Sequence, residues 1–203
     1  MARARVFQAL LDRPLSKRAA LARATGLAPS SVRWHLGALR AAGLLRTAEL
    51  PGPARYFADG TVEPDRRGTL AALRAPHAIA VLSAVARSPG LTLTELAREV
   101  RASPQAVLRA EEAMRPLGFL EALKSGRYRR FYPGAGLAAF AALQTAELPG
   151  RFGRVEAALK GAGESVSVTR RTRDEIVFQV GRRGARREFH LKAWSPIASE
   201  AHR

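Results

Sequence analysis

An internal repeat at an offset of 75 residues constrains the fold of this chain more than any other feature of its sequence. Leu-Ala-Arg at residues 21–23 recurs at 96–98, and Arg-Tyr-Phe at 55–57 is matched by Arg-Phe-Tyr at 130–132. Pro29 also aligns with Pro104, and no gap is needed. Matching positions in one register indicate two copies of one structural unit.

Apolar spacing and helix-ending residues predict the same elements in both copies: three helices followed by a β-hairpin. In copy one we expect helices over residues 4–11, 16–24 and 29–43 and strands over 44–48 and 55–58. Ser16 is expected to cap the second helix, and Pro29 to open the third.

Copy two repeats this order after residues 61–75, which suit a helical linker. We expect helices over residues 77–87 and 104–117 and strands over 119–123 and 128–132. Its second helix begins with Thr92-Leu93-Thr94-Glu95, which fits a capping box.

The last third of the chain has a different pattern. Two helical stretches, 137–148 and 151–160, are separated by Pro149-Gly150. Three runs of apolar residues with a period of two follow at 164–168, 175–180 and 187–194. This periodicity is typical of a β-sheet with one buried face.

Three helices followed by a β-hairpin resemble the winged helix-turn-helix superfamily. The residues that carry the resemblance are Leu21-Ala22, Ser30-Ser31-Val32-Arg33-Trp34-His35-Leu36, and Leu39 with Gly43-Leu44-Leu45. The series is similar to the recognition-helix pattern of ArsR/MarR-type regulators, and the doubled arrangement resembles predicted archaeal transcription regulators. The resemblance covers residues 1–60 and 76–135 and implies DNA binding.

The expected fold class is therefore α+β: two tandem winged helix-turn-helix domains followed by a small helix plus three-stranded antiparallel meander module. The expected parts are a first winged helix (1–60), a helical linker (61–75), a second winged helix (76–136) and a C-terminal module (137–203). We expect each winged helix to enclose its own apolar core, so that residues 1–136 fold and bind duplex DNA alone.

The chain carries 34 basic and 17 acidic side chains, a net charge of +17. Such an excess destabilises a compact fold by self-repulsion unless an anionic partner offsets it. Arginines outnumber lysines 30 to 4. The arginine fork suits two-point contacts with phosphate and guanine, and a GC-rich genome is an equal explanation of the bias. Double-stranded DNA is the expected partner.

Several other classes of function are not favoured. The chain has no cysteine, no paired histidine spacing, no Gly-rich phosphate loop and no Gly-x-Ser-x-Gly motif. Its longest uncharged apolar stretch, 137–143, is far below membrane-spanning length. We expect no enzymatic activity, no metal, no cofactor and no membrane partner, and a cytoplasmic location.

The candidate DNA contacts on the third helix of copy one are Ser30, Ser31, Arg33, Trp34 and Gly37. Arg33 suits two hydrogen bonds to guanine, the serine hydroxyls suit phosphates or bases, and Gly37 permits close approach. For Trp34, packing on the second helix or the hairpin is an equal alternative.

Further candidates lie on the hairpins, called wings, and on copy two: Arg55, Gln105, Arg109, Lys124, Arg127, Arg129 and Arg130. The dense basic wing of copy two suits contacts with phosphates or with a narrow minor groove. Glu111 and Glu112 on its third helix disfavour base reading there.

The leading hypothesis is a sequence-specific transcription regulator with two winged helices in one chain and an asymmetric target. An architectural DNA-binding protein with little sequence preference is the alternative. In a third hypothesis the C-terminal module or the second winged helix serves homodimerisation or partner binding, through an exposed Leu108 and the Glu111 and Glu112 face. The effector, if any, is unknown.

Overall fold

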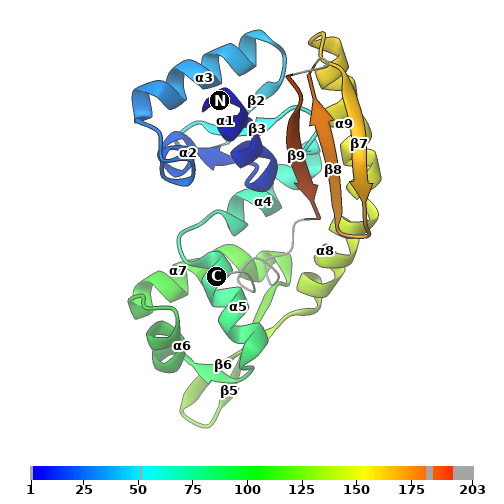
Figure 1. The fold of residues 1–203 in the computed structure, drawn as a ribbon. Coiled ribbons are helices and arrows are strands. Elements are labelled where there is room, and N and C mark those ends of the chain that lie inside the picture. Colours follow the sequence, from blue (N-terminus) through cyan, green and yellow to red (C-terminus); the bar gives the residue numbers. More distant parts are fainter. Residues whose placement is uncertain (1, 51, 182–184, 194–203) are drawn as a thin grey trace. The chain divides into compact units, whose positions relative to one another are not determined.

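The computed structural model describes residues 2–50, 52–181 and 185–193 (Figure 1). These residues form two compact units. The first unit comprises residues 1–68 and 145–193, and the second contains residues 69–144. The fold class is α+β, as expected.

Copy one lies in the first unit and contains six elements: α1 (Ala2–Asp12), β1 (Ser16–Lys17), α2 (Arg18–Thr25), α3 (Pro29–Ala41), β2 (Leu45–Ala48) and β3 (Arg55–Ala58). Its antiparallel sheet has the order β1-β3-β2. The three helices and the hairpin were expected, whereas the two-residue strand β1 was not.

Ser16 does not cap α2, so that expectation is wrong. Ser16 lies in β1 opposite Tyr56, and its hydroxyl donates a 2.6 Å hydrogen bond to the carbonyl of Arg13. Lys17 occupies the N-cap position without a side-chain cap. Pairing with β3 therefore places Ser16 in a strand, although the local sequence predicts that it begins the helix.

Copy two repeats the arrangement with α5 (Ala78–Arg87), β4 (Leu91–Thr92), α6 (Leu93–Glu99), α7 (Pro104–Met114), η2 (Arg115–Leu117), β5 (Leu120–Ser125) and β6 (Tyr128–Pro133). Its sheet has the order β4-β6-β5. The capping box is confirmed, because the Thr92 amide donates to the Glu95 carboxylate at 2.8 Å and the Glu95 amide donates to the Thr92 hydroxyl at 3.4 Å.

The helices that precede and follow copy two are short: η1 (Pro64–Arg66), α4 (Arg67–Leu73) and α8 (Ala135–Ala146). No single helix in the described part of the chain is long and apolar enough to cross a membrane. One bent pair, Pro64–Leu73 with Ala78–Arg87, meets that criterion by length and composition only.

The C-terminal module consists of α9 (Leu148–Gly161) and an antiparallel sheet of β7 (Val166–Arg171), β8 (Glu175–Val180) and β9 (Arg187–Lys192) in sequential order. The expected helix and three-stranded meander are confirmed. Pro149 does not separate two helical stretches as expected but lies in the first turn of α9, where a missing amide hydrogen costs nothing.

Copy one does not enclose its own core, which corrects the expectation of self-contained winged helices. One apolar cluster joins residues of α1, α2 and α3 to residues of α9, β8 and β9. Phe7 of α1 meets Phe189 of β9 edge to face, with ring centroids 5.4 Å apart. The C-terminal module therefore completes the core of copy one instead of forming a separate domain.

Polar contacts reinforce this shared core. Gln8 of α1 exchanges two 2.9 Å hydrogen bonds with the backbone of His190 in β9. The buried Arg151 donates to the carbonyl of Lys192 at 2.6 Å, and burial lowers its pKa to about 10. Gly60 lies so close to the backbone of Arg154 that an added Cβ would be 2.7 Å from it.

Replacing Phe189 with alanine should destabilise the first unit by about 3–5 kcal/mol, because the substitution leaves a cavity between α1 and the sheet. Phe189→Leu should cost less. The free energy of unfolding is measured in urea in a Trp194→Phe background, so that Trp34 fluorescence is the signal from the first unit. Val168→Ala is the control, since Val168 is 43% exposed and should change stability by less than about 0.5 kcal/mol. Equal midpoints for Phe189→Ala and Val168→Ala would contradict the shared core.

Candidate nucleic-acid interface

Helix α3 has one buried and one exposed face. Pro29 lies in its first turn, where its fixed φ suits a helix start. Val32, Leu36 and Leu39 are 0%, 4% and 2% exposed and form the inner stripe. The opposite face is free for contacts with a partner.

The exposed face of α3 forms a shallow hollow of about 630 Å³, lined by Ser30, Arg33, Trp34, Gly37, Ala38 and Ala41. These residues are three or four positions apart and therefore lie along one stripe of the helix. Nothing lies within 4 Å of a Cβ added at Gly37. The small residues keep the surface low along the helix before and after the two large side chains, Arg33 and Trp34.

Trp34 is 63% exposed, so the alternative in which it packs on α2 or the wing is not observed. Its ring meets the edge of the neighbouring His35 ring, with centroids 4.9 Å apart. The guanidinium carbon of Arg3 lies 5.9 Å from the Trp34 ring centroid. The indole is thus accessible on the same stripe as Arg33.

The wing of copy one offers little free charge. Arg46 forms an ion pair with Asp59 at 3.0 Å, and Arg40 donates to the Thr47 hydroxyl at 2.8 Å. Arg55 is half-buried in β3 opposite Lys17. Of the predicted contacts in copy one, the structure brings Ser30, Arg33, Trp34 and Gly37 together. Ser31 is exposed but does not line the hollow, and Arg55 lies on a separate element.

Copy two contains a buried carboxylate that the sequence did not reveal. Glu111 of α7 is 1% exposed and accepts hydrogen bonds from Arg115 at 2.8 and 2.9 Å and from Arg129 at 2.8 Å. Two guanidinium groups therefore compensate one buried charge. The repeat held a signal for this, because Glu111 aligns with the buried Leu36.

Two of the four basic side chains on the wing of copy two bind groups within the protein, and the other two are exposed at its tip. Arg129 is paired with Glu111, and Arg130 donates to the carbonyl of Gly90 at 2.7 Å. Lys124 and Arg127 are exposed at the tip, where Arg127 donates to the Tyr128 hydroxyl at 2.6 Å. The tip therefore presents two cations and an exposed aromatic ring.

The face of α7 differs from the expected one. Gln105, Arg109 and Glu112 are exposed, Leu108 is only partly exposed, and Glu111 points inward. The mixed apolar and acidic face expected for dimerisation is thus smaller than the sequence indicated. Within residues 2–50, 52–181 and 185–193, no three His, Asp or Glu side chains come together as metal ligands.

No protein family and no curated protein matches this chain. Among solved structures, the chain is similar to the crystal structure of IdeR from T. acidophilum, with 13% identity and a TM-score of 0.24 over 97% of this chain and 92% of that one.

Glu111→Gln should destabilise the second unit by about 1–3 kcal/mol, because charge-assisted hydrogen bonds are replaced by weaker ones. The loss of stability stays below that for a fully buried ion pair, because the Arg115 and Arg129 side chains are 58% and 44% exposed. Water can therefore hydrate their guanidinium groups once the carboxylate is removed. Glu112→Gln, on the exposed neighbour, is the matched control. The free energy of unfolding is measured by circular dichroism in urea, and equal values for both variants would contradict a structural role of Glu111.

Proposed function

We propose that this protein is a DNA-binding transcription regulator that reads duplex DNA through the exposed stripe of α3. The observation that carries the proposal is the composition of that stripe: it combines Arg33 and Trp34 with small residues and contains no acidic side chain. A helix of this kind fits the major groove, where arginine can bind guanine O6 and N7 at once.

The corresponding stripe of α7 supports a different contribution from copy two. The offset of 75 places Gln105, Leu108, Arg109 and Glu112 at the positions of Ser30, Arg33, Trp34 and Gly37. The carboxylate of Glu112 repels phosphate at the point where Gly37 permits close approach. Copy two is therefore proposed to contribute affinity through its wing, and the target is proposed to be asymmetric.

On the wing of copy two, phosphate contacts are assigned to Lys124 and Arg127. Both are exposed at the hairpin tip. Arg129 and Arg130 were candidates from the sequence, but their guanidinium groups bind Glu111 and the Gly90 carbonyl. We propose that these two arginines hold the hairpin against the helices and that the tip follows the DNA backbone.

An architectural protein with little sequence preference is the second candidate, favoured by the net charge of +17. Selection of bound oligonucleotides from a random pool separates the two. A regulator enriches one defined motif, whereas an architectural protein enriches none.

Arg33→Ala should remove preference at one base position of the selected motif and leave non-specific affinity nearly unchanged, because one guanine contact contributes about 1–3 kcal/mol of discrimination. Arg109→Ala is the control on α7 and should leave the selected motif unchanged. Competition titrations against scrambled DNA measure both effects. An Arg33→Ala motif identical to that of the parent protein would contradict base reading by α3.

Arg127→Gln should reduce the slope of log affinity against log salt by about one unit, because one phosphate contact and its released counterion are lost. Arg129→Gln is the matched control two residues away, and its slope should equal that of the parent protein because Glu111 already neutralises this guanidinium. DNA titrations at several salt concentrations give the slopes. Equal losses in both variants would show that the ion pair opens on DNA, and no loss in either would remove the wing from the interface.

A further inference from the structure

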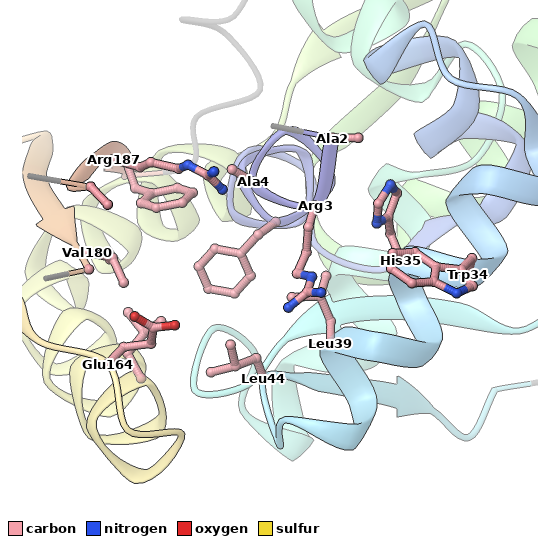
Figure 2. Close-up of a pocket in the computed structure, with 15 residues that line it drawn as sticks. Ala2, Arg3, Ala4, Trp34, His35, Leu39, Leu44, Glu164, Val180 and Arg187 are labelled. Carbon is pink, nitrogen blue, oxygen red and sulfur yellow. The ribbon is translucent and has the colours of Figure 1, made fainter.

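A cavity of about 550 Å³ lies within the first unit, between copy one and the C-terminal module (Figure 2). Its volume falls in the range of sites for small organic ligands. Apolar side chains from both parts line it: Phe7, Leu39, Leu44, Leu159, Val180 and Phe189. It shares Trp34 with the exposed stripe of α3, and its other lining residues are different ones.

Three charged side chains also line the cavity: Arg3 of α1, Arg187 of β9 and Glu164, which follows α9. Figure 2 shows Arg187 extending from the sheet side toward α1, with Glu164 on another side of the cavity. Across the described residues, neither arginine has a carboxylate partner, and Glu164 has no cationic one. The cavity thus offers two unpaired guanidinium groups beside an apolar surface.

His35 adds a polar atom to the same wall. Its Nδ1 is buried and has no hydrogen-bond partner in the described structure. Desolvation lowers the pKa of His35, and the charge of Arg3 lowers it further. With a neutral imidazole, Arg3 and Arg187 are the cations among the described residues that line the cavity.

We propose that this cavity binds a small organic monoanion: a carboxylate held by Arg3 and Arg187, with an aromatic or aliphatic body packed on the apolar residues. Arginine guanidinium groups suit a carboxylate because each offers a planar fork of donors. Glu164 opposes a second negative charge, which favours a monoanion over a dianion. Phe7 and Phe189 give the body an aromatic surface.

The ligand site is connected to the proposed DNA-reading helix, and this second step rests on the proposed function. Arg3 lies over the Trp34 ring, and both Trp34 and His35 belong to α3 and to the cavity wall. A carboxylate that draws Arg3 into the cavity removes this cation from the indole. The ligand then changes the exposed stripe of α3 and with it the affinity for DNA.

The test uses the full chain with Trp194→Phe, which leaves Trp34 as its only tryptophan. Three probes of the same body differ in charge: 4-phenylbutyrate, 4-phenylbutyramide and 4-phenylbutylamine. Trp34 fluorescence and calorimetry should show saturable binding of the carboxylate, about tenfold tighter than that of the amide or the amine.

Arg3→Gln and Arg187→Gln should each weaken binding of 4-phenylbutyrate at least about threefold, since each removes a charge-assisted contact. Arg13→Gln is the control, because Arg13 is exposed just after α1 and does not line the cavity. Circular dichroism verifies that each variant is folded. Equal affinity for carboxylate and amide, no effect of either arginine variant, or no saturation up to about 10 mM carboxylate would each overturn the site.

A separate DNA titration distinguishes failure of the site from failure of the proposed function. With the selected oligonucleotide, 4-phenylbutyrate should shift DNA affinity in the parent protein, and Arg187→Gln should need at least about threefold more of it for the same shift. A chain that binds the carboxylate but no duplex would overturn the proposed function and leave the ligand site intact. Ligand binding with unchanged DNA affinity would overturn the coupling through Arg3 and Trp34.

Discussion

A continuous series of aromatic contacts joins the two ends of the first unit, and the rest of that unit depends on it. Phe7 contacts Phe189, Phe189 stacks on Phe178 at 5.9 Å, and Phe178 meets Phe152 at 5.2 Å. These rings connect α1 to β9, β8 and α9. Since α1 also packs against α2 and α3, the helix proposed to read DNA is positioned by residues more than 110 places away in the sequence.

The positive charge of the chain serves folding as well as binding. Arg115 and Arg129 compensate Glu111, Arg130 satisfies a backbone carbonyl, and the buried Arg151 holds the strand end at Lys192. Arginine is suited to these roles because its charge persists on burial and its donors form a fixed fork. A net charge of +17 therefore overstates the charge available to a polyanion, and individual ion pairs decide which side chains are available.

Local signals allowed the order of the elements to be predicted, and long-range pairing limited the rest. The repeat, the proline at the start of α3 and the Thr92 capping box are each encoded within a few residues. Strand β1 is only two residues long and forms by pairing with β3. Local sequence gives no sign of this pairing, so Ser16 was expected to cap a helix. The shared core escaped prediction because Phe7 and Phe189 each follow an ordinary apolar pattern, and nothing in either pattern identifies its partner.

The repeat also shows how one scaffold can serve two roles. Val32, Leu36 and Leu39 of α3 align with Val107, Glu111 and Met114 of α7, and all six are buried. Copy two tolerates glutamate in place of leucine at this core position because Arg115 and Arg129 bind its carboxylate. In copy one, Arg40 aligns with Arg115 but donates a hydrogen bond to Thr47 instead. That exchange ties the wing of copy two to its third helix through Arg129. Glu112, by contrast, is exposed and gives the outer stripe of α7 its negative charge. A substitution at Glu111 therefore changes the buried charge of copy two, and a substitution at Glu112 changes its surface charge.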